Sequence, residues 1–516
     1  MRFIAGVLCA LLLGLGACAE VVETEPAPEG IDQQQQGLDV FKSLAILDRK
    51  ILQPFTFKRV LDQLVAQSGI AGMTSLQLFN QWWDTQNMGP SLGLGSNCDD
   101  QPGFPGLNQF PWECPRAEGH QAFDPFELPN DPLYIPVGLF NRFDLAPSNG
   151  AHCGEYRIVF AMDPNHQLAQ GRNFVIFEAI LPNPNPAAGL AGCKPVAQFW
   201  EDLSSLSMST RRAHLEKFYF HGLGGGFEPV VHVNHYGLML GANGYGCSTG
   251  QIRTNQFEQG PWTMREYKLV KDCRCGVDDC KLLMVPMTVK TNPHGEMFNV
   301  SSVEPRVPAL VSTVASQAGS LSVPDINKFS YEVSDTLNAA ESPIDDPAQV
   351  NNYLLQFSSP INAPFDAAIA ASLPPGSTLS PSDIVARAQV LSCAGCHRQS
   401  NSANLGDGLI WPNSLGFTHV DEFVDPITDR YHVSDGMISD FLPFREALLN
   451  DFLQNGPPAG GATRCSIQMP PELSMSPDEC KKATKDPSVI KFPSSAIRMM
   501  RDRWEGGRLL GRRAGH

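Results

Sequence analysis

The sequence is short of charged residues, and of positive charge in particular. Charged side chains make up 18 % of the 516 residues, below the roughly 25 % typical of soluble domains. Lysine and arginine number 38 against 54 aspartates and glutamates, so the formal net charge is −16. Proteins bind nucleic acid largely through basic side chains that neutralise phosphates, so this balance excludes a general nucleic-acid binder.

A membrane-spanning leader is also lacking, because the apolar stretch from Ile4 to Gly16 is too short to cross a bilayer permanently. The stretch follows Arg2 and ends in small residues, which is the pattern of an export signal. Leu15-Gly16-Ala17-Cys18 resembles the lipobox of bacterial lipoproteins. The resemblance implies a lipidated Cys18 and a chain anchored at the cell envelope, with Ala19 favouring the outer membrane. The alternative is an ordinary signal peptide in which Cys18 is incidental.

Cysteine usage is typical of an exported protein. Of the 14 cysteines, ten remain once Cys9, Cys18 and a C-x-x-C pair discussed below are set aside. An even number in an oxidising compartment predicts up to five disulfides. The expected local pairings are Cys98 with Cys114, Cys153 with Cys193, Cys465 with Cys480, and Cys247 with one of Cys273, Cys275 and Cys280. The last four sulfurs are alternatively the ligands of a zinc ion.

The hydrophobic period changes along the chain. Near the N-terminus, apolar residues from Phe57 to Val65 recur at helical spacing after Thr56. Further on, short segments rich in β-branched and aromatic residues predict strands. We expect strands at 155–162, 173–181, 229–233, 251–257, 262–269 and 282–290, and a helix near 196–218. Short strands joined by Gly and Asn turns favour an antiparallel sheet over a doubly wound fold.

The segment that carries chemistry lies at 380–397. Ser380, Pro381 and Asp383 open a helix well, and this helix runs into Cys393-Ala394-Gly395-Cys396-His397. C-x-x-C-H is the attachment signature of c-type haem. Residues 380–456 therefore resemble a c-type cytochrome domain, which implies an all-α fold for this part of the chain. The competing interpretations are a structural disulfide between the two cysteines and a thiol redox pair.

The resemblance implies the roles of individual residues. Covalent haem c would be held by thioethers to Cys393 and Cys396, with His397 as the proximal iron ligand. Met437 is the expected sixth ligand. His419, His432 and an open sixth position remain as alternatives.

The implied function is one-electron transfer with an unidentified redox partner of the cell envelope. Two other classes stay open. One is a haem-free surface binding or structural lipoprotein with a Cys393–Cys396 disulfide. The other is a haem oxidase or peroxidase-like enzyme with an open iron site. The sequence favours an electron carrier or binding protein over a hydrolase.

The expected fold class is multidomain α+β, with an N-terminal helical module, a central antiparallel β-rich domain and a C-terminal all-α cytochrome c-like domain. The expected parts are a signal peptide (1–17), a linker (18–38), a helical module with a disulfide loop (39–130), the β-rich domain (131–300), an irregular connector (301–379), the cytochrome c-like domain (380–456) and a C-terminal extension (457–516).

Three further features carry weaker signals. His232 and His235, with His221 nearby, are candidate metal ligands. Residues three apart in a strand point to opposite faces, so chelation by the first two requires a bend at Asn234. The segments NRFDLAP (141–147) and RTNQF (253–257) are distinctive, but the sequence alone attaches no chemistry to them.

Overall fold

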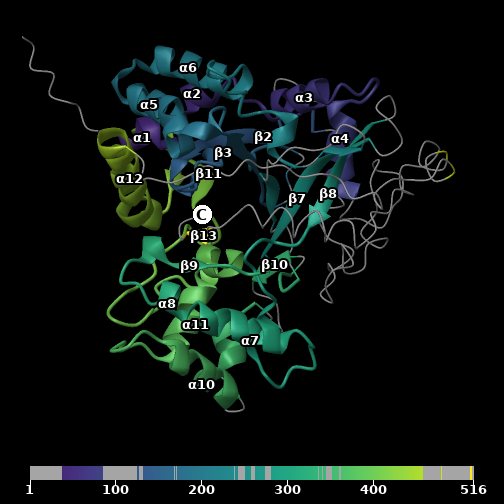
Figure 1. Cartoon of the computed structure of the whole chain (residues 1–516). Helices are drawn as coiled ribbons and strands as arrows, with labels where there is room; N and C mark the ends of the chain where they lie inside the picture. The colour runs from purple at the N-terminus through teal and green to yellow at the C-terminus, as the bar shows by residue number, and fades with distance from the viewer. Residues whose placement is uncertain are drawn as a thin grey trace, which may run out of the picture. The chain divides into compact units, whose positions relative to one another are not determined.

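A mostly antiparallel nine-stranded sheet organises the chain (Figure 1). The computed structural model describes residues 38–84, 125–126, 132–167, 169, 171–237, 239–241, 250–256, 262–273, 280–334, 336–339, 341–344, 351–358, 362–456, 478, 481 and 512–513. Among these residues, no helix is long and apolar enough to span a membrane.

The strands follow the order β1-β2-β3-β4-β6-β7-β10, and β5 and β8 also pair with β7. Neighbours are antiparallel except β5 and β7. The strands are β1 (Ala45–Ile46), β2 (Tyr134–Arg142), β3 (His152–Met162), β4 (Asn173–Pro182), β5 (Met239–Gly241), β6 (Gln251–Gln256), β7 (Trp262–Cys273), β8 (Lys281–Met287) and β10 (Glu341–Ile344).

Five of the six predicted central strands are confirmed, as β3, β4, β6, β7 and β8. The strand predicted at 229–233 is wrong. The backbone amides of Val230 and Val231 donate to the carbonyl oxygens of Phe218 and Tyr219, at the end of a helix, and not to a neighbouring strand. The segment then turns through a short 3-10 turn, Val233–His235.

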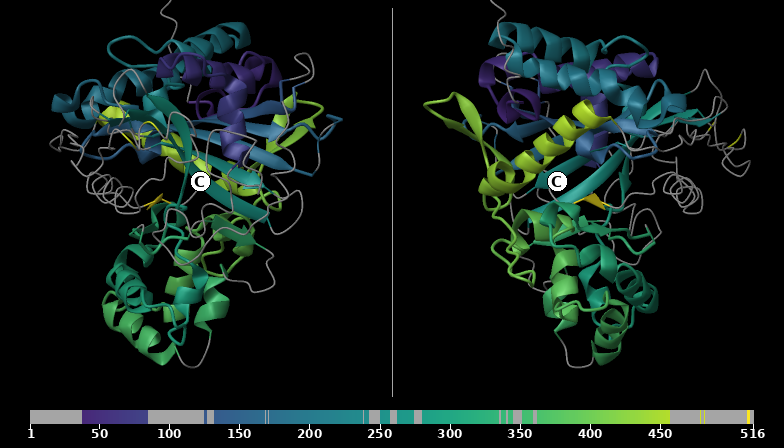
Figure 2. Two further views of the ribbon diagram at one scale, coloured as in Figure 1. Left: turned by 90° about the vertical axis from the view of Figure 1, so that its right-hand side faces the viewer. Right: turned by 60° about the vertical axis from the view of Figure 1, so that its left-hand side comes forward.

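Helices cover one side of the sheet and gather again at the other end of the unit (Figures 1 and 2). The first group is α1 (Val40–Ser43), α2 (Arg49–Leu52), α3 (Phe57–Ser68), α4 (Ser75–Asp84), α5 (Lys194–Asp202) and α6 (Met208–Phe220). The second is α7 (Val307–Ser316), α8 (Ala318–Leu321), α9 (Tyr353–Phe357), α10 (Ala363–Ser372) and α11 (Pro381–Gln389). The last helix, α12 (Leu442–Asn455), lies beside α1 and α5 of the first group (Figure 1).

Local sequence explains the helix boundaries. Thr56 caps α3 by accepting a hydrogen bond from the Arg59 amide, and Gly69 ends it with a left-handed φ of 69°. The single helix expected near 196–218 is two helices. The Arg211 guanidinium donates to the carbonyl oxygens of Leu203 and Leu206, at 3.0 and 2.7 Å, and so satisfies the end of α5 before α6 begins.

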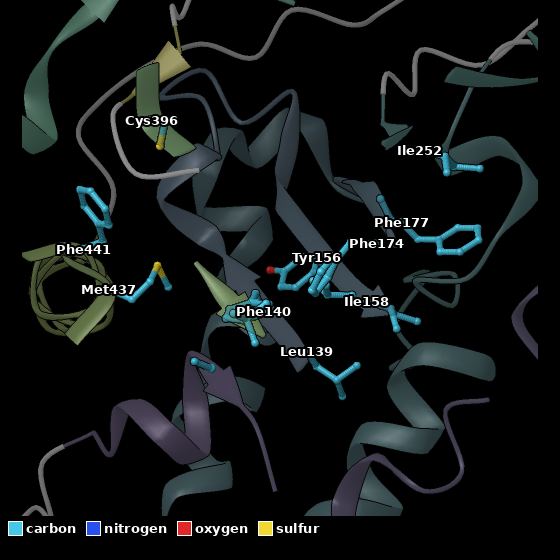
Figure 3. Close-up of a cluster of buried hydrophobic side chains, with 14 of the residues drawn as sticks. Leu139, Phe140, Tyr156, Ile158, Phe174, Phe177, Ile252, Cys396, Met437 and Phe441 are labelled. Atoms are coloured by element: carbon cyan, nitrogen blue, oxygen red, sulfur yellow. The ribbon is translucent and has the colours of Figure 1, made fainter. Parts of the chain in front are cut away.

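The prediction of a separate all-α cytochrome c-like domain is wrong. Residues 380–456 include a β-hairpin, β11 (Val420–Asp425) with β12 (Arg430–Val433). Cys396, Met437 and Phe441 belong to the same hydrophobic core as Tyr156 of β3. In Figure 3, these three side chains lie on one side of that cluster and Phe177 on the other. The segment thus packs against the central β-rich region, because its apolar side chains complete that region's core.

The disulfide predicted between Cys153 and Cys193 is confirmed. It joins the start of β3 to the residue before α5, and both cysteines are fully buried. Cys280 is also disulfide-bonded. The other predicted pairings and the lipobox with Cys18 involve positions outside the described residues or side chains. Two short strands, β9 (Ser330–Tyr331) and β13 (Arg512–Arg513), form a separate pair.

Candidate functional site

The C-x-x-C-H segment follows a helix with a well-formed start. The Ser380 hydroxyl accepts a hydrogen bond from the Asp383 amide, and the Asp383 carboxylate accepts one from the Ser380 amide. After α11 the chain forms a π-helical turn over Gly395–Gln399, which contains Cys396 and His397. π-Helical turns are rare and frequently mark functional sites.

The turn is fixed against the sheet region by hydrogen bonds that span long sequence distances. The Cys393 amide donates to the Asn292 side-chain oxygen at 3.3 Å, and the Ala394 amide to the Ser342 hydroxyl at 3.1 Å. Gly395 is required sterically, since a Cβ there would lie 1.8 Å from the Gln389 carbonyl oxygen. The position of the two cysteines is therefore set by strand β10 and the loop after β8.

His397 has one ring nitrogen engaged and one available. Its Nδ1 lies 2.9 Å from the carbonyl oxygen of Phe417. A carbonyl only accepts, so Nδ1 carries the proton and Nε2 keeps its lone pair. Burial lowers the pKa of His397 to about 4, so the imidazole is neutral at pH 7. Metal-binding histidines characteristically have this arrangement, with the non-ligating nitrogen donating to a backbone carbonyl.

Both cysteines are buried thiols. Burial is the main cause that raises the pKa of Cys393 to about 12, with the Arg253 guanidinium opposing it. The Cys396 Sγ lies 3.3 Å from the Nε2 atom of His419. The thiols are one turn apart on the helical segment, which is the spacing that haem attachment needs.

A cavity lies between this segment and the sheet. Its walls come from alternate positions of β2, β3, β4, β6 and β7, which share one face of the sheet, and from the 393–445 segment. It is lined by Phe140, Arg142, Arg157, Val159, Phe174, Ile176, Glu178, Arg253, Asn255, Met264, Cys393, His397, Thr418, His419, Val420, Met437 and Arg445.

Four arginines and a single carboxylate line this cavity. Arg253 pairs with Glu178 and Glu266, each at 3.1 Å. At the other end, Arg142 binds Asp144 through Nε and Nη2, both at 2.9 Å, and Arg445 lies 3.8 Å from the same carboxylate. Two guanidinium groups thus share one buried acid, and the carboxylates of Glu155 and Glu178 also raise the pKa of Arg142.

Arg445 is the less stabilised of these two guanidinium groups. Burial, followed by the neighbouring Arg142, lowers the pKa of Arg445 well below its ordinary value. Arg142 Nη1, Asn255 Oδ1 and Thr418 Oγ1 are buried cavity-lining atoms with no hydrogen-bond partner among the described residues. Unsatisfied buried polar groups cost about 1–3 kcal/mol each. The cavity is therefore suited to a ligand that is largely apolar and carries a carboxylate.

Met437 and His419 lie at this cavity, whereas His432 does not. Met437 is on a second π-helical turn, Met437–Phe441, and its side chain points from that turn toward the sheet (Figure 3). His432 is about half exposed and lies 3.8 Å from Asp421. Of the three candidate sixth ligands, the structure brings two to His397 and leaves the third on the surface.

Sequence reasoning missed the arginines. Arg142 and Arg253 lie in the two segments singled out as distinctive, NRFDLAP and RTNQF, and both segments supply cavity walls. A signal was present as charged residues at alternate positions of a predicted strand, as with Glu155 and Arg157 in β3. No protein-family model matches the chain, and no curated protein or solved structure matches it.

Proposed function

We propose that this protein binds haem covalently through Cys393 and Cys396, with His397 Nε2 as an iron ligand, and transfers single electrons at the cell envelope. The observation that supports this best is the cavity, which brings Cys393, a neutral histidine with an available nitrogen, and four arginines to one place. Bound haem would supply an iron centre that cycles between two oxidation states.

The residues around the cavity have separable roles in this proposal. The strand residues Phe140, Val159 and Phe174 give it apolar walls and exclude water. Arg142 and Arg445 would hold the carboxylate groups of the porphyrin, since guanidinium groups bind carboxylates in a bidentate manner. This assignment explains why two arginines share Asp144 at the cavity.

Hydrogen bonding favours Met437 over His419 as the second iron ligand. His419 Nε2 lies 3.2 Å from the Cys396 carbonyl oxygen, to which it must donate, and its Nδ1 lies 2.8 Å from the Ser434 hydroxyl. Neither nitrogen has a spare lone pair in that arrangement. The Met437 thioether is a soft ligand that can bind iron without a change of tautomer. Methionine ligation raises the reduction potential of a haem.

Absorbance tests the proposal directly. Full-length protein from a host that matures c-type cytochromes should give a pyridine haemochrome band and a mass increase of one haem per chain. Cys396→Ala should lose one thioether, and Cys393→Ala with Cys396→Ala should lose covalent haem. Val303→Ala, at a fully exposed position, is the matched control and should keep the band. Colourless wild-type protein from that host would contradict the proposal.

A further inference from the structure

A second group of metal-ligating side chains lies far along the chain from the C-x-x-C-H segment, in the loop after α6. Glu228, His232 and His235 each offer one ligand atom, and these atoms lie within 4.8 Å of one another. The Glu228 carboxylate oxygens lie 3.3 Å from His235 Nε2 and 3.7 Å from His232 Nε2. The required bend is present, because Val233–His235 form a 3-10 turn that brings both imidazoles to the same side.

The two ring nitrogens of His235 face two acceptors, so this point requires a positive charge. Nδ1 lies 3.2 Å from the Val230 carbonyl oxygen, which can only accept, so Nδ1 carries a proton. Nε2 lies 3.3 Å from the carboxylate oxygen of Glu228, and either a second proton on the ring or a metal ion between these two atoms removes their repulsion. The fully buried ring cannot turn away into solvent.

Helix α3 holds the loop that contains His232 in place through hydrogen bonds. Gln63 and Gln67 of α3 donate to the carbonyl oxygen of Val231 at 2.7 and 3.1 Å, and the Val233 amide donates to Gln67 at 3.0 Å. These bonds fix the backbone on both sides of His232. A pre-formed backbone of this kind lowers the conformational cost of binding an ion.

We propose that Glu228, His232 and His235 form a binding site for one divalent transition-metal ion, of which zinc is the representative. Zinc binds imidazole nitrogen and carboxylate oxygen at about 2.0–2.2 Å, so ligand atoms at tetrahedral positions lie about 3.3–3.6 Å apart. The 3.3 Å separation between Glu228 and His235 is within that range, and the 3.7 Å separation between Glu228 and His232 is just above it. Three protein ligands and a half-exposed Glu228 leave the fourth position open to solvent.

The three ligands are not equivalent. The Nδ1 atom of His232 accepts a hydrogen bond of 3.3 Å from the Asn234 amide, so its Nε2 carries the proton. Coordination through Nε2 requires His232 to change tautomer and give up that contact. Glu228 and His235 need no such change, and they contribute more to the affinity than His232.

Zinc titration of tag-free, chelator-treated full-length protein tests this site. Isothermal titration calorimetry and elemental analysis should find one zinc ion per chain at pH 7.5. Glu228→Gln should weaken zinc binding at least about tenfold, and Glu228→Gln with His232→Asn should abolish it. His221→Gln, an exposed histidine outside the group, is the control and should bind zinc as the wild type does.

The same titration is repeated with the double variant Cys393→Ala, Cys396→Ala. Any zinc ion that this variant binds is not held by the two thiols. These Glu228 and His232 substitutions are at partly exposed positions, so a folded protein is expected, and circular dichroism confirms it. A wild type that binds no zinc, or Glu228→Gln protein that binds it unchanged, would overturn the proposal. The haem band is a separate readout, and this site does not depend on it.

Discussion

The Nδ1 atom of His397 donates a hydrogen bond of 2.9 Å to the carbonyl oxygen of Phe417, and this contact orients the ring that we assign to iron. The ring also packs against Trp262, with centroids 5.2 Å apart. Phe417 is 20 residues further along the chain and Trp262 is in β7. The histidine of the motif is thus held by two segments that lie outside the motif.

Removing this imidazole should separate haem attachment from iron ligation. His397→Ala keeps both thiols, so we expect a covalent haemochrome band of near-normal intensity per chain. The iron loses one ligand, and the native protein should then bind carbon monoxide without denaturant. His432→Gln, at the exposed histidine, should leave both the spectrum and carbon monoxide binding as in the wild type. An unchanged native spectrum in His397→Ala would contradict the assignment.

Met437→Leu should lower the reduction potential while leaving the fold intact. The substitution conserves volume, so its cost in unfolding free energy should stay below about 1.5 kcal/mol. Axial ligands set haem potentials over about 0.8 V, and losing a thioether shifts the potential downward. Redox titration of Met437→Leu is compared with Met208→Leu, an exposed methionine on α6. Equal potentials in the two variants would show that Met437 is a core residue and not a ligand.

The sequence predicted local features well. The helix start at Ser380 and Asp383 and the β-branched run of β4 each depend on residues near one another in the chain. Such signals are readable because hydrogen bonding and strand propensity operate over short separations. Here local reasoning identified most central strands and the helix that precedes the two cysteines.

Long-range packing was beyond that reasoning. The Cys393 amide bonds to Asn292, 101 residues earlier, and Arg445 shares Asp144 with Arg142 across the sheet. No periodicity within 380–456 indicates that its apolar residues complete a β-sheet core. The assumption of an independent all-α domain failed for this reason. The cavity could not be predicted either, because its walls come from five strands and three later segments.

Two cavity arginines should differ in their effect on stability. Arg253→Met removes a partner that Glu178 and Glu266 share, although Glu178 keeps Arg157 at 3.3 Å and Glu266 keeps Lys268 at 3.9 Å. Breaking a buried ion pair costs about 3–5 kcal/mol of unfolding free energy, and we expect the lower end of that range. Arg445→Met leaves Asp144 with its bidentate partner Arg142, so we expect a loss of less than about 1.5 kcal/mol. Urea unfolding of the two haem-free variants measures the difference. Equal losses would contradict the unequal pairing described above.

The Cys153–Cys193 disulfide should be a major source of stability. The two cysteines are 40 residues apart and fully buried. Closing a loop of that length restricts the unfolded chain by about 4 kcal/mol in the chain-entropy model, within the typical range of 2–4. Replacing both cysteines by alanine should lower the unfolding free energy by that amount in urea. The variant should retain the haem band, since neither cysteine lines the cavity.

Acid should destabilise the haem-free protein through its buried histidines. Burial lowers the pKa of His397 to about 4 and that of His419 to about 3, against 6.5 when unfolded. Between these values and pH 6.5 the unfolded chain binds more protons, so the stabilisation is complete above pH 6.5 and falls as the pH falls. The slope is at most about 1.4 kcal/mol per pH unit for each histidine.

Urea unfolding of haem-free protein between pH 7 and pH 4 measures this slope. His397→Gln should flatten it by about one proton, whereas the exposed His432→Gln should leave it unchanged. A slope that is the same in haem-free wild type and His397→Gln would show that His397 is not held neutral by burial.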